Sequence, residues 1–274
     1  GGYYVGKWKD GRRDGFGFSV APHEVVKCGV WAKGRFRGEQ MLYHSERIYG
    51  IDISKYQHVH KRRVYGIDWR NLRITRLGHT ADRNALGAVD YPVSFVYIKS
   101  TEGLTVFNPY YTQDVRAARR YGFPVGAYHF FSTRPAMSQA DYFLKKSRLR
   151  KGDLPPMLDV ELSDRRIAAM GGRDVLFREM LVWLKEVGRR SGTTPIIYVS
   201  QDFVNRYMPF APEELKAYPV WVARYGEYKP YVHLLYWQLS PDGRVRGIQG
   251  DVDIDVFNGS EEQFKRYLRA QTVK

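Results

Sequence analysis

Cysteine is almost absent from this chain, since Cys28 is the only one among 274 residues. A single thiol excludes an intrachain disulfide scaffold. It fits either a reducing compartment or an extracytoplasmic protein that has no disulfides. Uninterrupted apolar runs of about 18 residues are also missing, so we expect no membrane-spanning helix. The chain starts Gly1-Gly2-Tyr3-Tyr4 and shows neither the basic nor the apolar segment of a targeting signal.

Several motifs of common functional sites are missing as well. The sequence contains no G-x-x-x-x-G-K-[ST] loop, no G-x-G-x-x-G followed by a helix and no G-x-S-x-G elbow. His58-x-His60 is the only close histidine pair, and no third ligand follows at a metal-binding spacing. We therefore expect a loop pair there, with no metal and no cofactor.

Acidic residues are outnumbered by basic ones, 29 Asp+Glu against 44 Lys+Arg, which gives a net charge of +15. Such an excess indicates an anionic partner, or serves solubility alone. Residues 1–48 carry 9 basic and 5 acidic groups and the remainder carries 35 and 24, so the charge is spread over the whole chain. No recognised nucleic-acid motif occurs, so we expect no specific nucleic acid partner.

An internal repeat distinguishes residues 1–46 from the rest. The pattern G-x-W-x-x-G-x-x-x-G occurs at Gly6–Gly15 and again 23 positions later at Gly29–Gly38. Asp10-Gly11 is a two-residue hairpin signal between alternating runs. We expect two short β-hairpins that pack on each other or on the larger domain. The first copy resembles a MORN repeat, a family whose members serve as interaction or lipid-proximal modules. A plain β-hairpin cap on the larger domain is the alternative.

Residues 47–274 alternate short apolar runs with helical stretches. Eight runs read as strands: Tyr49–Ser54, Phe95–Ser100, Val125–Phe131, Pro156–Glu161, Ile196–Ser200, Val220–Tyr225, Leu234–Leu239 and Val252–Phe257. Helices are expected at about 109–121, 136–149, 172–191 and 260–270. The order predicts an α/β fold, a (β/α) barrel that is irregular in its second half, where connections are shorter. Residues 58–92 are expected to form a long loop with up to one short helix.

Carboxylates collect at the ends of these strands, where a (β/α) barrel places its chemistry. Asp52 lies on the first strand, Asp159 and Glu161 end the fourth, and Asp253 lies on the last. Residues i and i+2 of a strand share one face, about 6.5 Å apart. Two acids this close repel, so one is expected to keep a proton near neutral pH, as glycoside hydrolysis requires. Two solvated acids at a strand end are the alternative.

Eight segments in this order resemble glycoside hydrolase family 25, the Chalaropsis-type lysozymes. They are Gly50-Ile51-Asp52-Ile53-Ser54-x-x-Gln57, Phe95–Gly103, Gly126–Phe130, Pro156–Glu161, Ile197–Ser200, Val220–Tyr225, Tyr236–Ser240 and Val252–Gly259. The resemblance implies a hydrolase of the β-1,4 bond between N-acetylmuramic acid and N-acetylglucosamine in peptidoglycan. This sequence departs from the family where Ser100 replaces a frequent Ala and Asp255 a frequent Asn.

The same resemblance implies a role for each acid. Glu161 would be the general acid and later the base. Asp159 would stabilise the oxocarbenium ion or position the substrate's N-acetyl group as an internal nucleophile. Asp52 and Asp253 would complete the catalytic cluster. The chemistry alone leaves retention or inversion open, because that depends on the carboxyl separation, and the family's tendency is towards retention.

Further residues near the strand ends are candidate substrate-binding residues. Aromatic faces stack on sugar rings, and Tyr128, Tyr198, Trp221 and Tyr225 lie in suitable places, although barrel packing is the alternative for each. Gln238 and Trp237 are adjacent, so they face opposite sides of a strand, and the family pattern favours Gln238. The second strand end adds Lys99 and Glu102. By the same alternation, we expect His129 to be structural.

These inferences define the expected setting of the protein. Its partner would be peptidoglycan glycan strands, with an anionic cell-wall polymer held by the basic surface, and it would act as a monomer in the cell envelope or outside the cell. Two other functions stay open: a barrel that binds wall glycan without cutting it, and a hydrolase of the same fold directed at chitin.

Overall fold

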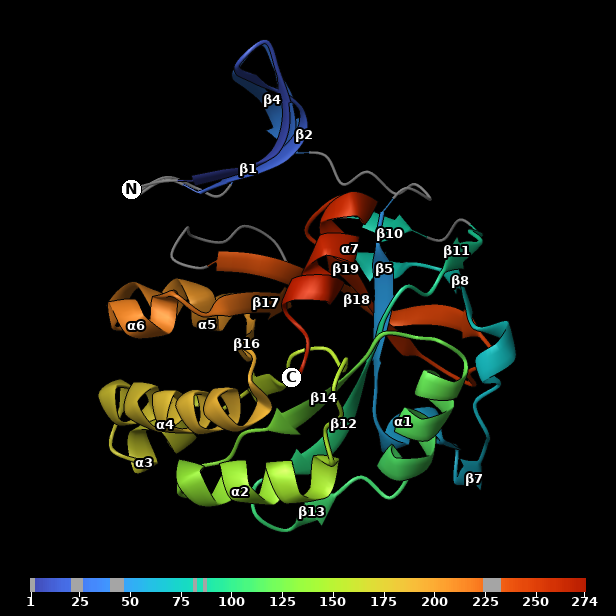
Figure 1. Ribbon diagram of the computed structural model, residues 1–274, viewed down its shortest axis with the longest axis vertical. Helices are drawn as coiled ribbons and strands as arrows, with labels where there is room; N and C mark the ends of the chain where they lie inside the picture. Colours follow the sequence, from blue (N-terminus) through green and yellow to red (C-terminus); the bar gives the residue numbers. More distant parts are fainter. Residues whose placement is uncertain (1–2, 21–26, 40–46, 81–82, 86–87, 224–232) are drawn as a thin grey trace.

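A closed barrel of eight strands forms the main body of the chain in the computed structural model, which describes residues 3–20, 27–39, 47–80, 83–85, 88–223 and 233–274 (Figure 1). The strands are β5 (Tyr49–Ile53), β12 (Val96–Glu102), β14 (Val125–Phe130), β15 (Met157–Val160), β16 (Ile196–Ser200), β17 (Pro219–Ala223), β18 (His233–Arg246) and β19 (Val252–Phe257). The first seven run parallel, and β19 closes the ring antiparallel to both β18 and β5. The expected α/β barrel is confirmed.

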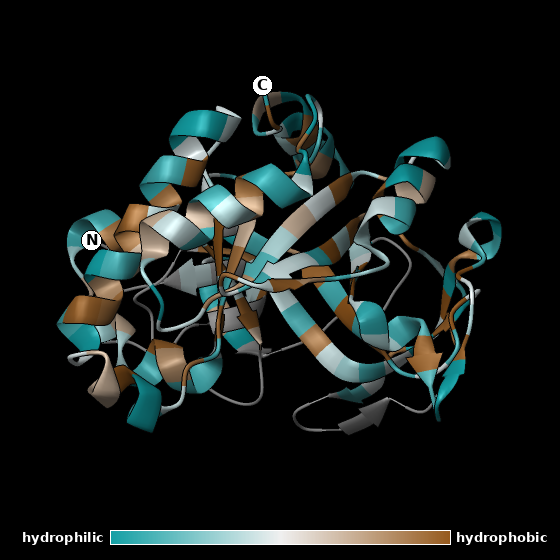
Figure 2. Ribbon diagram, turned by 90° about the horizontal axis from the view of Figure 1, so that it is seen from below, coloured by the Kyte–Doolittle hydropathy of each residue, from teal (hydrophilic) through white to brown (hydrophobic). Residues whose placement is uncertain are grey.

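Helices connect the strands from β12 to β17 on the outside of the barrel. They are α1 (Tyr111–Arg120), α2 (Ala136–Ser147), α3 (Asp164–Ala169), α4 (Arg173–Ser191), α5 (Gln201–Arg206) and α6 (Glu213–Lys216), with α7 (Glu261–Ala270) at the chain's end. The four longest match the expected helices, whereas α3, α5 and α6 are too short to show a helical period in the sequence. Figure 2 shows hydrophilic residues along the outer faces of the helices and apolar bands on the strands.

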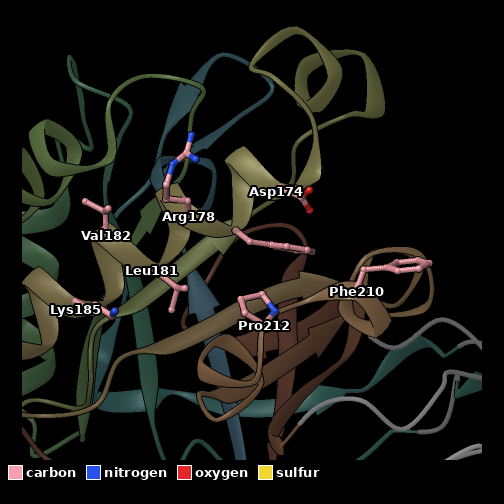
Figure 3. Close-up of a pocket in the computed structure, with 8 residues that line it drawn as sticks. Asp174, Arg178, Leu181, Val182, Lys185, Phe210 and Pro212 are labelled. Carbon is pink, nitrogen blue, oxygen red and sulfur yellow. The ribbon is translucent and has the colours of Figure 1, made fainter.

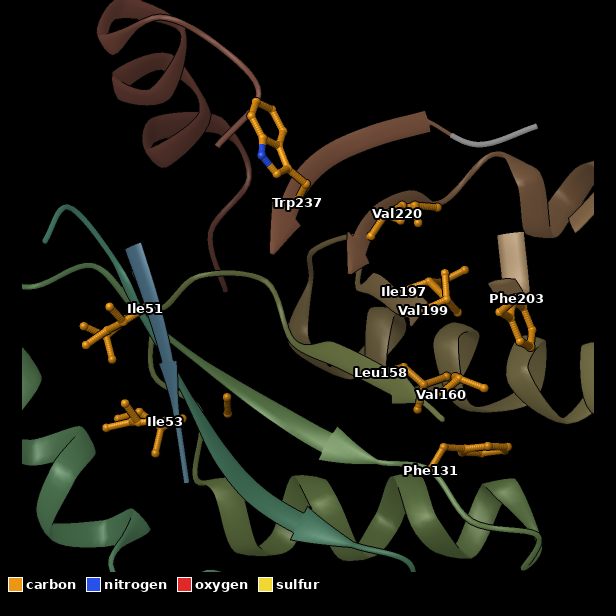
Figure 4. Packing of buried hydrophobic residues seen from close by; sticks show 14 of the residues in the cluster. Ile51, Ile53, Phe131, Leu158, Val160, Ile197, Val199, Phe203, Val220 and Trp237 are labelled. Carbon is orange, nitrogen blue, oxygen red and sulfur yellow. The ribbon is translucent and has the colours of Figure 1, made fainter. Parts of the chain in front are cut away.

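Strand alternation separates two apolar cores. Outward-facing side chains such as Ile51, Leu158 and Val199 pack under the helices (Figure 4). Inward-facing aromatic side chains, including Tyr97, Trp221 and Tyr236, fill the middle of the barrel. Two glycines provide space for this filling, because a Cβ on Gly50 would lie 2.2 Å from the Phe95 ring and one on Gly126 would lie 2.3 Å from the Tyr97 ring.

Helix α7 closes the amino end of the barrel. Its Phe264 is buried against Phe95 and Phe257, with ring centroids 5.8 Å and 5.0 Å away. Ser260 and Gln263 form a capping box that fixes where the helix begins. With one end filled by aromatic rings, the opposite end, at the carboxyl ends of the parallel strands, is left for a site.

Residues 58–92 are not the expected loop. They form β6 (Val59–His60), β7 (Arg63–Val64), β8 (Arg73–Arg76), β9 (Gly78–Thr80), β10 (Arg83–Ala85) and β11 (Tyr91–Pro92), with a short 3-10 helix at Trp69–Asn71. Strand β8 was missed because it pairs with the far end of β18, which runs well beyond the expected Leu239. A partner so distant in sequence leaves no local pattern.

The repeats at the amino terminus form a separate four-stranded antiparallel sheet in the order β1 (Tyr3–Lys9), β2 (Arg12–Val20), β3 (Lys27–Ala32) and β4 (Arg35–Glu39). Both hairpin turns, Asp10-Gly11 and Lys33-Gly34, have left-handed backbones, as two-residue hairpins require. Trp31 is buried against Tyr4 and Phe36. The two expected hairpins are thus confirmed, and they pack on each other.

No helix in the described ranges is both long and apolar enough to cross a bilayer.

Candidate active site

Acidic side chains from three strands face the open end of the barrel. Asp52 lies on β5, Asp159 on β15 with Glu161 just after it, and Asp253 on β19. Asp52 and Asp159 are 8% and 7% exposed, Asp253 is half-buried, and Glu161 reaches the surface. The four predicted catalytic residues therefore meet at one end of the barrel, with Glu161 at its mouth.

Gln238 holds one side of this acidic group. Its amide nitrogen donates to the Asp52 Oδ2 at 3.3 Å, and its amide oxygen accepts from the Tyr198 hydroxyl at 3.0 Å. All three side chains are buried. The amide orients the Asp52 carboxylate and lowers its pKa, which partly offsets the rise caused by burial. Trp237 packs outward among the apolar residues, so Gln238 is the one that faces the lumen.

The Asp52 and Asp253 carboxyl groups lie opposite each other on neighbouring strands, where they can form a hydrogen bond. Two carboxyl groups can do so only when one carries a proton. Burial raises the pKa of Asp253 to about 9 and that of Asp52 to about 7, with charge repulsion from nearby acids adding to both. Asp253 is therefore the protonated donor near neutral pH and Asp52 the acceptor.

Asp159 and Glu161 form the second pair of acids, and charge repulsion acts between them. Burial, followed by repulsion from Glu161 and Asp52, raises the pKa of Asp159 well above its usual range. Partial removal from water also raises the pKa of Glu161. Lys99 lowers the pKa of both acids. Its ammonium lies 2.8 Å from the Glu102 carboxylate and 4.3 Å from the centre of the Phe130 ring.

This arrangement supplies the groups that general acid catalysis needs. The cluster holds protons at a pH where isolated acids would be ionised. The reason is that several carboxyl groups lie close together with little contact with water, and Lys99 is the cation that acts on Asp159 and Glu161. Glu161 is the member that both reaches the surface and keeps a raised pKa. Asp159, deeper in the barrel, gains most from any positive charge that develops above it.

Two of the expected aromatic residues lie beside the acids. Tyr128 and Tyr198 are each 7% exposed, and the acids raise the pKa of both hydroxyls in addition to the effect of burial. Both hydroxyls thus stay protonated. The Tyr198 hydroxyl donates to Gln238, whereas the Tyr128 hydroxyl can donate to an acceptor on a substrate. Tyr225, which the sequence also suggested, lies outside the described residues.

Trp221 does not lie where the sequence suggested. Its side chain is 0% exposed, and its ring packs against Tyr97 and Tyr236 in the middle of the barrel. A ring at this depth cannot stack on a sugar, so the expected subsite role is corrected to a packing role. Alternation identified its lumen-facing side but gave no information about its depth.

Tyr56 is an aromatic residue that the sequence reasoning missed. It belongs to the 3-10 helix Lys55–Gln57, which follows β5, and it is 68% exposed. The Ser54 hydroxyl and the Gln57 side chain form a capping box that fixes this turn. The sequence could have indicated Tyr56 by its position, four residues after Asp52 and just beyond the end of the strand that carries it.

Comparisons with known proteins decide the family. The model described as "Glycosyl hydrolases family 25" matches residues 51–248. The chain belongs to glycosyl hydrolases family 25. It is therefore a glycoside hydrolase, and lysozymes are among its relatives. Asp253 lies beyond the matched residues, so its place in the site rests on the geometry of β19 against β5.

Family 25 relatives extend over most of the chain. "Uncharacterized protein YegX" of Escherichia coli (strain K12) is 33% identical over 228 residues, 82% of this chain and 74% of that protein. "Lysozyme M1" of Streptomyces globisporus is 29% identical over 229 residues, 78% of this chain and 68% of its own length. The solved bacterial lysozyme from Streptomyces coelicolor has a TM-score of 0.64 at 26% identity, over 80% of this chain and 96% of that one.

Two buried histidines of this family 25 chain, His129 and His58, have structural surroundings. His129 is fully buried between Thr101 and Gln139, at 2.7 Å and 3.1 Å, and burial lowers its pKa to about 4. His58 is buried beside Asp114. Within the described ranges, no group of three His, Cys, Asp or Glu side chains is arranged to hold a metal ion.

A cavity lies on the outside of the barrel, away from the acids. It measures about 430 Å³ and is formed by helix α4 and the segment around Phe210 and Pro212 (Figure 3). Asp174, Arg178 and Lys185 line it together with apolar side chains, and none of the candidate catalytic residues does. The barrel mouth therefore remains the candidate active site.

Proposed function

We propose that this chain is a peptidoglycan hydrolase that cuts the β-1,4 bond between N-acetylmuramic acid and N-acetylglucosamine. The observation that carries the proposal is the acidic cluster of Asp52, Asp159, Glu161 and Asp253 at the open end of a family 25 barrel. The lysozymes and muramidases among its relatives support this substrate.

In this mechanism Glu161 gives its proton to the glycosidic oxygen as the bond breaks. Its raised pKa keeps that proton available, and its position at the mouth allows contact with the leaving sugar. Once the leaving sugar has departed, the Glu161 carboxylate takes a proton from the attacking water.

Asp159 acts on the positive charge that develops at the sugar. Its repulsion from Glu161 and Asp52 is unfavourable in the free enzyme. A cationic transition state replaces that repulsion by attraction, so the ionised form of Asp159 stabilises the transition state more than the ground state. The charge belongs either to an oxocarbenium ion or to an N-acetyl group acting as the internal nucleophile, and Asp159 suits both.

The other members position these two acids and the substrate. The Asp253–Asp52–Gln238–Tyr198 chain of hydrogen bonds fixes the acidic floor. Tyr128 offers a hydroxyl for the reacting N-acetyl group, and Lys99 with Glu102 sets the charge at the β12 side. Tyr56 adds an exposed ring on which a sugar can stack.

The wider setting is proposed on the same basis. We place the division between the β-hairpin sheet, residues 1–46, and the Chalaropsis-type catalytic domain, residues 47–274. The sheet would act as a MORN-like interaction module, the basic surface would attract an anionic wall polymer, and the protein would act as a monomer in the envelope or outside the cell. Salt that releases the protein from walls but spares hydrolysis of small fragments would support the electrostatic part.

Product analysis tests the proposal. Purified peptidoglycan is digested, the products are reduced with borohydride, and mass spectrometry identifies the sugar at the new reducing end. Reduced N-acetylmuramic acid is the expected product. Reduced N-acetylglucosamine, cleavage of chitin fragments alone, or glycan binding without any cleavage would each contradict it, and the last two correspond to the chitinase and binding-only alternatives.

A further inference from the structure

The β6–β7 hairpin has an unusual turn. Val59 pairs with Val64 and His60 with Arg63, which leaves Lys61 and Arg62 as the two turn residues. Both have a left-handed backbone, with φ of 47° and 65°. Two-residue turns of this kind normally use Asn-Gly, because most side chains disfavour the conformation. Two long cationic side chains therefore occupy a turn to which neither is suited, and such local strain points to a function.

The hairpin lies against the segment that leads into Asp253. The side-chain amide of Gln57, at the end of the 3-10 helix before β6, donates to the backbone carbonyl of Asp251 at 3.1 Å. Gly250 has no side chain, and this leaves room for the His60 ring, whose Nδ1 would lie 3.1 Å from a Cβ there. The hairpin thus contacts the segment that leads into Asp253 and starts from the strand that carries Asp52.

A buried pair holds the base of the hairpin in place. The His58 ring lies 2.8 Å from the Asp114 carboxylate of α1 and 3.0 Å from the Tyr65 carbonyl, and it stacks on Tyr110. The Tyr65 amide also donates to the His58 carbonyl at 2.8 Å. Figure 1 shows β7 at the edge of the barrel near α1. The hairpin is therefore anchored on two sides.

The charge at the tip is uncompensated. Lys61, Arg62 and Arg63 are exposed, and none of them forms an ion pair within the described part of the chain. The nearby Asp251 is already paired with Arg244. Three adjacent cations without a partner repel one another, and an anion bound among them would relieve this repulsion.

We propose that the β6–β7 hairpin binds carboxylates on the peptide stems of the glycan strand held in the active site. This inference rests on the proposed function. The acidic cluster itself repels an anionic strand, so a cationic rim beside it compensates for that repulsion. The hairpin adjoins the segments that carry Asp52 and Asp253, so the anions it meets are those attached to the bound strand itself. Phosphate groups of other wall polymers share the chemistry, and the experiment separates them.

The test uses a variant that should fold without difficulty. Lys61→Asn with Arg62→Gly removes both cations and installs the preferred turn residues, so its melting temperature should equal or exceed that of the wild type. Arg63→Gln removes one cation and leaves the turn unchanged. Lys33→Asn with Arg148→Gly is the matched control, because it removes two cations from left-handed positions in other elements, the β3–β4 turn and the end of α2.

The substrates are soluble stem-bearing glycan fragments, either native or with their carboxylates converted to amides. KM, together with Kd from fluorescence anisotropy of labelled fragments, is measured at low and high salt. On native fragments at low salt, we expect KM and Kd of the double variant to be about 3- to 10-fold higher than those of the wild type. Arg63→Gln should raise KM and Kd less. On amidated fragments all proteins should be equal, and the control should match the wild type throughout.

Other results would overturn the inference. Equal KM and Kd for the wild type and the double variant on native fragments would exclude the hairpin as an anion site. An equal loss on amidated fragments would show a role in holding the glycan itself. A difference seen only on walls that retain phosphate polymers, and lost after their removal, would assign the hairpin to phosphate. If the wild type cleaves nothing, the proposed function fails, while the Kd values still decide the role of the hairpin.

Discussion

Asp52 and Asp253 lie directly opposite each other on the antiparallel strands β5 and β19, and one proton between them allows a hydrogen bond. The closure of the barrel by an antiparallel strand creates this pair. Directly opposite residues on neighbouring strands bring their side chains close enough to interact. The close approach of these two acids therefore follows from the strand register.

Replacing Asp253 by Asn should stabilise the protein while lowering its activity. The folded-state pKa of Asp253, about 9, exceeds its unfolded value of about 4. The stability that protonated Asp253 contributes is therefore lost as the pH rises from about 4 to about 9. Asn keeps a donor for Asp52 and has no proton to lose. We expect a gain of about 1–3 kcal/mol in the free energy of unfolding at pH 8, which shrinks towards pH 4.

Thermal or urea unfolding of the Asp253→Asn variant from pH 4 to pH 9 measures this gain. The exposed Asp174 on α4, changed to Asn, serves as the control and should show no such pH trend. A gain that is constant with pH, or a loss at pH 8, would show that Asp253 does not hold the proton.

Lys99 and Glu102 should move the pH optimum in opposite directions. Lys99 lowers the pKa of both Asp159 and Glu161, whereas Glu102 raises that of Asp159. We expect Lys99→Met to shift the profile of kcat/KM upward by about 0.5–1 pH unit and Glu102→Gln to shift its acid limb downward. Rates on soluble fragments from pH 4 to pH 9 provide the measurement. Shifts of the same sign in both variants would argue against a direct effect of charge.

The buried pair of His58 and Asp114 should make stability fall at alkaline pH. The Tyr65 carbonyl only accepts, so the His58 Nδ1 must donate, and its Nε2 contacts the Asp114 carboxyl group. If the pair carries no additional proton, the bare Nε2 of His58 faces a carboxylate oxygen of Asp114. Both atoms are acceptors, so no hydrogen bond can form between them. Accordingly, burial raises the pKa of Asp114, and Asp114 raises that of His58.

The Asp114→Asn variant isolates this effect, because an Asn amide can donate to a neutral His58 and satisfy every group. The raised pKa of His58 adds stability below its unfolded value of about 6.5, and this is lost as pH rises through the folded value. The wild type should therefore lose about 1 kcal/mol relative to Asp114→Asn between pH 6 and pH 9. Parallel stability curves for the two proteins would show that the pair holds no extra proton.

Strand identity and orientation were predictable because they depend on local pattern. The run around Asp52 alternates outward Ile51 and Ile53 with an inward acid, and the structure shows this arrangement. The gathering of Asp159 and Asp253 beside Asp52 followed from barrel topology. Each of these conclusions needed only a strand's period and a rule for where parallel strands end.

Features set by distant contacts were not predictable. Trp221 faces the lumen as expected, but Tyr97 and Tyr236 cover it from other strands. Strand β8 exists because the extension of β18 pairs with it. The exposure of Tyr56 depends on how its capped turn leaves the barrel. Trp221 and β8 depend on partners that lie far away along the chain. Tyr56 depends on the geometry of a turn, which leaves no periodic pattern in the sequence.

The most direct test of the account compares Glu161→Gln on two substrates. On peptidoglycan the leaving sugar needs a proton, so the account predicts a kcat loss of roughly 10²–10⁴-fold. On an aryl glycoside of N-acetylmuramic acid with a good leaving group no proton is needed, and the variant should keep most of the wild-type bond-cleavage rate, measured as the burst or initial release of the aryl group. Equal losses on both substrates, or clearing of walls as fast as by the wild type, would contradict Glu161 as the general acid.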